Sequence, residues 1–196
     1  MSFVEEHCIL VPLTRDILET VGDFRCSVEP EIEAFFKEES VDYAAELMGV
    51  SYGFIDKANN HLVSAFCLTC ASVEMDEMPK SVRNKLNRKV PHVKQRETYP
   101  AVLLAQLAVF DEYKAFHIGD ELMDQIKLLV RHLTKRISAR YMIVDAINKP
   151  AVLAYYARNN FKMIFADEEE EKRSEGRDKD FTLRTRFMIT DLKDVN

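Results

Sequence analysis

The sequence predicts an α/β fold built on one mixed sheet. Residues 102–109 (VLLAQLAV) are apolar except for Gln106, and a run of this length is typical of a central strand covered on both faces. A helical period begins at Ile118, and residues 141–147 (YMIVDAI) are again typical of a strand. A crossover of this length lets the two strands pair in parallel. One face of the expected helix carries Ile118, Leu122, Met123, Ile126, Leu129, Val130 and Leu133.

The junction between this strand and this helix predicts an anion-binding site. The helix N-terminus opens beyond the carboxyl end of the strand, where free amides and the helix dipole favour a phosphate. Gly119 lies in the first turn of the helix, and a glycine there lets the backbone approach an anion closely.

The remaining elements follow from the hydrophobic pattern and the turn residues. The amino-terminal elements are a strand at 7–13, a turn capped by Thr14, a helix at 30–39 capped by Ser27, a short helix at 41–47, and a hairpin of strands 50–55 and 62–73. The later elements are a basic helix at 79–91, a helix at 148–159 with Pro150 in its first turn, a strand at 161–166 and a closing strand at 181–189. We expect the acidic run 167–171 (DEEEE) to be a solvated loop.

Length and composition favour a single domain spanning residues 1–196. Charged residues make up 31% of the chain and hydrophobic residues 47%, which excludes a disordered chain and membrane residence. The amino-terminal MSFVEEH lacks the basic charge of a signal peptide, so we expect a cytoplasmic protein. The net charge of −6 argues against general nucleic-acid binding.

Four cysteines do not form a disulfide framework in a chain of this length. Cys67 and Cys70 form a CxxC pair within an expected strand, where a spacing of three directs the side chains to opposite faces. We therefore expect buried thiols and no metal site, with metal or redox chemistry as the alternative.

Three local patterns resemble the GCN5-related N-acetyltransferase (GNAT) superfamily. LAVFDEYKAFHIGDEL is similar to its pyrophosphate turn, with Lys114 at the basic position, His117 at the first glycine and Gly119 at the second. VDAINKPAVLAYYARNNF is similar to a second family stretch, matched by Asn148, Ala151, Tyr155, Tyr156, Asn160 and Phe161. FRCSVEPEIEAFFKE, with PAVLLAQLAV later, resembles the branch whose toxins acetylate aminoacyl-tRNA.

The resemblance implies a fold and a cosubstrate. It implies a central mixed, mostly antiparallel sheet of about six or seven strands with a parallel splayed pair, flanked by about four helices. It also implies that acetyl-CoA is bound by Leu107, Ala108, Val109, Lys114, Ala115, Phe116, His117, Ile118, Gly119, Asp120 and Asn148. The sequence departs from the family at His117 and Asn160, which both stand in place of glycine.

The resemblance also implies how acetyl transfer would proceed. A backbone amide near Leu107 or Val109 would polarise the thioester carbonyl, and Tyr156 would be the general acid, because a phenol with a pKa near 10 stays protonated at neutral pH. The alternative is that Tyr155 and Tyr156 only pack the helix against the sheet, and we expect Tyr155 in the core. Asn148 is expected to contact the pantetheine, to cap the following helix, or to do both.

The sequence does not identify a general base. Five side chains are open candidates, and water is a further alternative. The candidates are Glu74, Asp76, Glu77, His92 and His117.

Three functions are compatible with these patterns. The first is direct acetyl transfer from acetyl-CoA to a primary amine of a small molecule or peptide, and the second is a toxin-like enzyme acting on aminoacyl-tRNA. The third is a CoA-binding module without turnover. The acidic net charge favours the first over the second, because tRNA binding favours a basic protein. The expected partners are acetyl-CoA and an amine acceptor, with no membrane; tRNA, a homodimer and an antitoxin are left open.

A basic segment could serve either of the first two functions. It would contact tRNA phosphates, meet the 3′-phosphate of CoA, or balance the acidic run at 167–171. Its seven basic residues are Lys80, Arg83, Lys85, Arg88, Lys89, Lys94 and Arg96.

Overall fold

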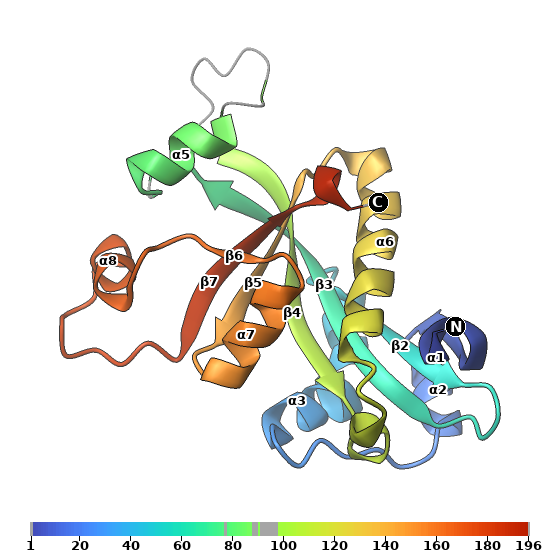
Figure 1. Ribbon diagram of the computed structural model, residues 1–196. Helices are drawn as coiled ribbons and strands as arrows, with labels where there is room; N and C mark the ends of the chain where they lie inside the picture. Colours follow the sequence, from blue (N-terminus) through green and yellow to red (C-terminus); the bar gives the residue numbers. More distant parts are fainter. Residues whose placement is uncertain (1, 77, 88–89, 91–97, 196) are drawn as a thin grey trace. The chain divides into compact units, whose positions relative to one another are not determined.

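The computed structural model describes residues 2–76, 78–87, 90 and 98–195, and these contain one seven-stranded mixed sheet (Figure 1). The strand order is β1-β2-β3-β4-β5-β7-β6, which confirms the expected sheet. The strands are β1 (Cys8–Pro12), β2 (Val50–Asp56), β3 (Leu62–Glu74), β4 (Thr98–Val109), β5 (Tyr141–Ile147), β6 (Lys162–Met163) and β7 (Thr185–Asp191).

The described residues form more helices than expected. The α-helices are α1 (Phe3–His7), α2 (Arg15–Thr20), α3 (Pro30–Ala34), α4 (Ser40–Ala45), α5 (Lys80–Asn87), α6 (Gly119–Ile137), α7 (Pro150–Arg158) and α8 (Glu168–Ser174). Three further helical segments are the π-helix η1 (Phe35–Glu39) and the 3-10 helices η2 (Asp111–Phe116) and η3 (Leu192–Asp194). Five of the α-helices have only five to seven residues, too few to display a helical period in the sequence. None of the helices in the described ranges combines the length and apolar character of a membrane span.

The chain divides into two compact units. The first contains residues 1–69 and 104–128, and the second contains residues 70–103 and 129–196. Strands β3 and β4 and helix α6 contribute residues to both units. That the units form a single domain stays a prediction.

The first unit contains the expected hairpin. Strands β2 and β3 are antiparallel, with Val50 opposite Leu68, and β1 pairs with β2 so that Cys8 lies opposite Asp56. Thr14 caps α2 as expected, because its side chain accepts the amide hydrogen of Ile17 at 3.3 Å. The core of this unit is made by Leu13, Val21, Phe24, Cys26, Phe36, Ile55, Leu62, Ala65, Cys67, Ala108 and Phe110.

The predicted helix cap at Ser27 is wrong. Helix α3 begins at Pro30, and its N-cap residue, Glu29, makes no side-chain capping bond. Proline at the first position needs no partner for its nitrogen, so a side-chain cap matters less here. Ser27 instead donates its amide hydrogen to Asp111 at 3.1 Å.

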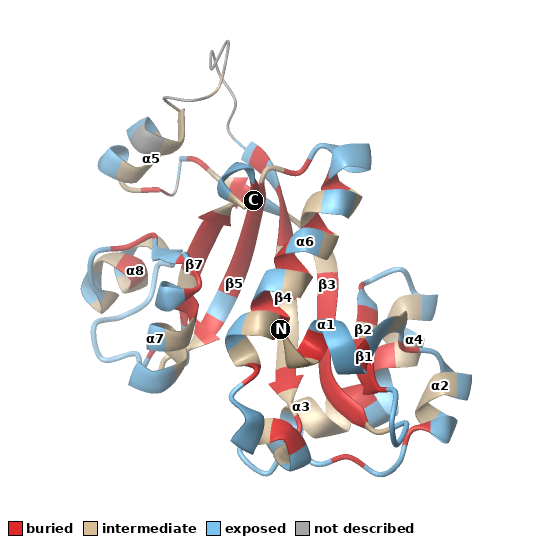
Figure 2. Cartoon of the chain, turned by 45° about the vertical axis from the view of Figure 1, so that its right-hand side comes forward, coloured by how far each residue is buried: buried red, intermediate tan, exposed pale blue. Residues whose placement is uncertain are grey.

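The second unit contains the parallel pair. Tyr141 of β5 lies opposite Ala101 of β4 and Ile143 lies opposite Leu103, which confirms the predicted parallel pairing. Strand β5 is antiparallel to β7 on its other side, and both strands are largely buried (Figure 2). The core of this unit is made by Val73, Met75, Met78, Tyr99, Ala101, Tyr141, Ile143, Ile164, Phe165 and Ile189.

The strand predicted at 161–166 is mostly irregular. Only Lys162 and Met163 pair with β7 as strand residues, and the Ile164 amide adds one hydrogen bond to the Phe187 carbonyl at 3.3 Å. Phe161 is buried, and Ile164 and Phe165 belong to the core of this unit. The apolar residues within 161–166 therefore indicate buried side chains but not a strand, because side chains of an irregular backbone can be buried as well. The helix predicted at 148–159 is confirmed as α7, with Pro150 in its first turn.

The acidic run is a helix, so the prediction of a solvated loop is wrong. Asp167 caps α8 by accepting the amide hydrogen of Glu170 at 2.8 Å, and carboxylates in the first turn are stabilised by the helix dipole. Glu171 turns inward and is 1% exposed. It forms an ion pair with Arg186 and accepts the amide hydrogen of Phe187 at 2.6 Å. The run therefore attaches α8 to strand β7.

We expect Glu171→Gln to lower the free energy of unfolding by about 3 kcal/mol, because it leaves the buried Arg186 charge unpaired. Urea unfolding followed by circular dichroism measures the change. Glu169→Gln is the matched control, since the Glu169 side chain is 55% exposed, and its effect should stay within about 0.5 kcal/mol. Equal stability of the two variants would contradict this role of the buried pair.

Candidate active site

The end of strand β4 presents backbone amides away from β3. The amide of Phe110 donates to the carbonyl of Val63 on β3 at 3.1 Å. Successive residues of a strand direct their amides to alternate edges, so the amides of Leu107 and Val109 are directed to the opposite edge of β4. Ala108 between them is buried, and its carbonyl accepts a hydrogen bond from Ser64 Oγ at 2.7 Å. The two amides are therefore suited to bind a carbonyl oxygen.

The turn after β4 has the backbone conformation of a glycine turn. His117 ends η2 with φ 54° and ψ 32°, which is left-handed, and its amide donates to the Lys114 carbonyl at 3.3 Å. Its side chain is exposed. The imidazole in place of a glycine therefore leaves the course of the backbone intact. Asn160, which also stands in place of a glycine, is likewise left-handed, with φ 63°.

Helix α6 starts directly after this turn. Ile118 is 2% exposed and anchors the first turn of α6, while Ala115, Phe116 and Asp120 are exposed. Gly119 is the first residue of the helix.

Turn η2 is held by the buried ring of Tyr113. Its hydroxyl donates to Asp56 at 3.1 Å and accepts from Asn59 Nδ2 at 3.0 Å. Burial raises the pKa of Tyr113 to about 12, so the phenol is neutral at physiological pH. No local sequence pattern indicates this contact, because it joins residues far apart in the chain.

Lys114 is already paired within the turn. It forms an ion pair with Asp111, which also accepts hydrogen bonds from the hydroxyl and amide of Ser27. Lys114 first, and then Ser27, lower the pKa of Asp111 to about 2. A phosphate would therefore compete with Asp111 for the Lys114 ammonium.

The first turn of α6 also carries acidic side chains, Asp120 and Glu121. The Glu121 carboxylate accepts hydrogen bonds from Ser2 Oγ at 2.7 Å and from the Val4 amide at 3.2 Å. The Ser2 hydrogen bond is the main cause that lowers the pKa of Glu121. These carboxylates weaken the attraction of the helix N-terminus for an anion. The sequence shows both acids directly after Gly119, but only the structure shows where α1 attaches.

In the second unit, Tyr156 projects from α7 into an apolar setting. Its side chain packs edge-on against Phe161, with ring centroids 5.3 Å apart, and the residue is 7% exposed. Burial raises the pKa of Tyr156 well above its usual value. Its hydroxyl has no hydrogen-bond partner among the residues that the structure describes. The group is thus a neutral phenol with a proton available to donate.

Tyr155 is not the core residue that we predicted. It is half-buried, and the guanidinium of Arg158 lies 5.0 Å from its ring centroid. The helical rotation of 100° between neighbours lets only one of the two tyrosines face the core, and that one is Tyr156.

One alternative predicted that Asn148 caps α7, and this is wrong. The N-cap position belongs to Lys149, and Asn148 Nδ2 donates to Glu168 at 3.0 Å and to the Leu183 carbonyl at 3.1 Å. Asn148 therefore links the start of α7 to α8 and to the chain preceding β7.

The general base remains unassigned. Glu74 accepts a hydrogen bond from Ser72 Oγ at 2.6 Å, Asp76 is exposed, and Glu77 and His92 lie outside the described residues. Within the described ranges, no group of three His, Cys, Asp or Glu side chains is placed to hold a metal ion. Cys67 is buried as predicted, but Cys70 is exposed, so the prediction of buried thiols is wrong for Cys70.

Neither a family model nor a curated protein matches this sequence. Solved structures do match. A bacterial toxin aligns over 96% of this chain and 92% of its own, with a TM-score of 0.72 and 17% identity. A tyrosine-to-phenylalanine mutant of KacT aligns over 97% and 98%, with a TM-score of 0.72 and 16% identity. AtaT complexed with acetyl-methionyl-tRNAfMet aligns over 92% and 93%, with a TM-score of 0.65 and 15% identity.

The chain has the GNAT fold. Within this fold, the predicted cofactor residues from β4, η2 and the start of α6 lie together in the first unit. Tyr156 and Asn148 belong to the second unit. That both sets of residues meet at one GNAT site stays a prediction.

We expect His117→Gly to leave acetyl-CoA affinity within about threefold of the wild type, because the backbone already has the glycine conformation. His117→Val should lower the free energy of unfolding by about 1–2 kcal/mol, since a β-branched residue is strained at positive φ. Calorimetric titration and urea unfolding measure the two effects. A large loss of affinity in His117→Gly would show that the imidazole itself binds phosphate.

Proposed function

We propose that this protein transfers an acetyl group from acetyl-CoA to the amino group of an aminoacyl-tRNA. The observation that carries the proposal is the shared fold with AtaT, solved with acetyl-methionyl-tRNAfMet, over 92% of this chain. A bacterial toxin and KacT share the fold over nearly the whole chain as well. This reverses the order of our first two hypotheses, because composition alone favoured a small-molecule or peptide amine.

The first unit would hold the cosubstrate. Acetyl-CoA supplies the acetyl group as a thioester, and AtaT has been solved with acetyl-CoA. The amides of Leu107 and Val109 would bind the thioester carbonyl and favour the negative charge that develops there. The left-handed turn at His117 and the amides that open α6 would bind the diphosphate. The residues assigned to this role are Leu107, Ala108, Val109, Lys114, Ala115, Phe116, His117, Ile118, Gly119 and Asp120.

The second unit would supply the acid. Tyr156 would hold a proton at Oη and donate it to the departing sulfur, while Asn148 Oδ1 would contact the pantetheine. Structures of both KacT and AtaT were solved as tyrosine-to-phenylalanine mutants. This supports a functional role for a tyrosine in proteins of this fold.

The net charge remains the strongest argument for the runner-up function, a small-molecule or peptide acetyltransferase. A chain with net charge −6 repels a polyanion at long range, so tRNA binding must depend on local basic surfaces. Helix α5 provides Lys80 and Arg83. The side chain of Lys85 and the residues Arg88, Lys89, Lys94 and Arg96 lie outside the described part of the chain.

The acceptor is tested by supplying radiolabelled acetyl-CoA with either a mixture of aminoacyl-tRNAs or a panel of free amines and peptides. We expect label in the tRNA fraction that is released by mild base, since the aminoacyl ester is labile, and little label in the amines. Deacylated tRNA is the control. Label in the amine panel alone would favour the runner-up, and no transfer to either would favour a CoA-binding module without turnover.

We expect Tyr156→Phe to slow turnover by about 10² or more while leaving acetyl-CoA affinity nearly unchanged, because it removes the acid and keeps the ring. Tyr155→Phe is the matched control and should change turnover little. Steady-state kinetics with a competent acceptor measure both variants.

The pH profile gives a second readout. Because burial raises the pKa of Tyr156, its phenol stays protonated up to at least about pH 10, so Tyr156 should cause no alkaline loss of kcat below that pH. Full activity of Tyr156→Phe would exclude Tyr156 as the acid.

A further inference from the structure

A cavity of about 380 Å³ lies within the second unit, at the carboxyl end of α6. Its described lining consists of four basic side chains and no acidic one, with small or apolar residues between them. The eight lining residues are Arg131, Thr134, Lys135, Ser138, Ala139, Arg140, Leu192 and Lys193. We name this cavity the basic pocket.

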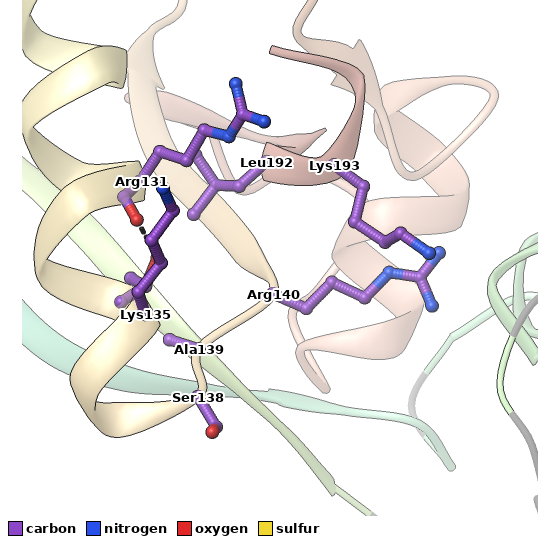
Figure 3. Close-up of a pocket in the computed structure, with 8 residues that line it drawn as sticks. Arg131, Lys135, Ser138, Ala139, Arg140, Leu192 and Lys193 are labelled. Carbon is purple, nitrogen blue, oxygen red and sulfur yellow. Dashed lines mark hydrogen bonds between the residues drawn. The ribbon is translucent and has the colours of Figure 1, made fainter. Parts of the chain in front are cut away.

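The basic residues reach the pocket from two walls (Figure 3). Arg131 and Lys135 come from the last two turns of α6, where the Thr134 hydroxyl bonds to the Arg131 carbonyl at 3.2 Å. Arg140 and Lys193 come from the segments before β5 and after β7. The Leu192 amide donates to the Arg140 carbonyl at 2.9 Å, which fixes these two segments to each other.

Only one of the four cations has a carboxylate partner among the described residues. Asp191 binds Arg140 through two nitrogens, at 3.2 Å to Nε and 2.7 Å to Nη2, and thereby holds that guanidinium in place. Arg131, Lys135 and Lys193 form no ion pair with any residue that the structure describes. Three basic side chains without a described ion-pair partner therefore line the pocket together with Arg140, which Asp191 holds in place.

The dipole of α6 explains only part of this arrangement. Lys135 lies in the last turn, where a cation is stabilised by the helix carboxyl end. Arg131 lies earlier in the helix, and Lys193 belongs to the carboxyl-terminal η3, so the dipole does not account for either. Bringing like charges together costs energy unless an anion lies between them.

We propose that the basic pocket binds phosphate groups at a site within the second unit that does not include Tyr156. A phosphate carries up to two negative charges and several acceptor oxygens in one small group. It can therefore bind several basic side chains of one pocket at once, which a single carboxylate does less well. The volume is within the range of small-ligand pockets. The phosphate comes from a free nucleotide or polyphosphate, or from an RNA backbone, and the experiment separates these sources.

The pocket lies at the start of β5, whereas α7 follows the end of the same strand. Seven residues of strand span roughly 20 Å, so within the second unit the pocket is far from the start of α7. A ligand in the pocket therefore does not need to touch Tyr156. Phosphate binding in the pocket can therefore be tested independently of the acetyltransferase activity.

The test titrates the whole protein at low salt with pyrophosphate, with ADP, and with a short RNA hairpin. The pocket variant is Arg131→Gln with Lys193→Gln. Its matched control is Lys162→Gln with Lys179→Gln, which removes the same charge from exposed positions elsewhere in the second unit. Thermal unfolding verifies that both variants fold.

We expect at least one probe to bind the wild type and the pocket variant to lose about tenfold or more in affinity, the loss expected from one charge-assisted hydrogen bond. The control should lose less than about threefold, and acetyl-CoA affinity should not change in either variant. Binding of pyrophosphate or ADP identifies a free phosphate ligand, and binding of RNA alone identifies a backbone site. No binding of any probe, equal losses in both variants, or a parallel loss of acetyl-CoA affinity would overturn the proposal.

Discussion

The candidate site depends on how strand β4 changes into helix α6 within ten residues. Buried Tyr113 fixes the middle of this connection through Asp56, and Asp111 fixes its start through Ser27. His117 then takes the left-handed conformation that lets α6 begin. Both polar anchors precede His117, and the buried side chain of Ile118 follows it directly, so the surrounding fold compensates the local strain at a position where a non-glycine residue is least favourable.

This connection has two opposing electrostatic properties. The helix dipole and the orientation of the backbone amides at the start of α6 favour an anion, as does the left-handed turn. Asp111, Asp120 and Glu121 place negative charge close to the same amides. Binding of a diphosphate would therefore depend on backbone geometry more than on net local charge, with Lys114 shared between Asp111 and the ligand.

The sequence predicted the elements that are long or strongly patterned. Strand β5 was predicted with its observed limits, and α6 and the β2–β3 hairpin with small differences, because each buries a regular set of apolar side chains. The acidic run was wrongly predicted to be a solvated loop, because its composition suggested that every carboxylate faces solvent. In the structure one of them, Glu171, is buried in an ion pair with Arg186. No local sequence pattern indicates that pairing, because the two residues are 15 positions apart.

The candidate site was predictable only in part. His117 and Asn160 were recognised as residues standing where glycine is usual, and both have a left-handed backbone, which had been expected only at Asn160. The core position of Tyr155 and the capping role of Asn148 were wrong, because the choice between two adjacent tyrosines depends on helix rotation, and a capping role depends on where the helix starts. The anchors Asp56 and Ser27 lie far from η2 in the chain, and no local pattern indicates such contacts.

The four thiols of the chain differ sharply in accessibility. Cys70 is exposed, while Cys8, Cys26 and Cys67 are buried, and burial raises the pKa of Cys8 to about 11 and that of Cys67 as well. A maleimide should therefore label Cys70 rapidly and the other three only when the surrounding structure opens. The chain thus carries a natural attachment point for a fluorophore on β3, and the slow labelling of Cys67 on the same strand would report how often that strand is released.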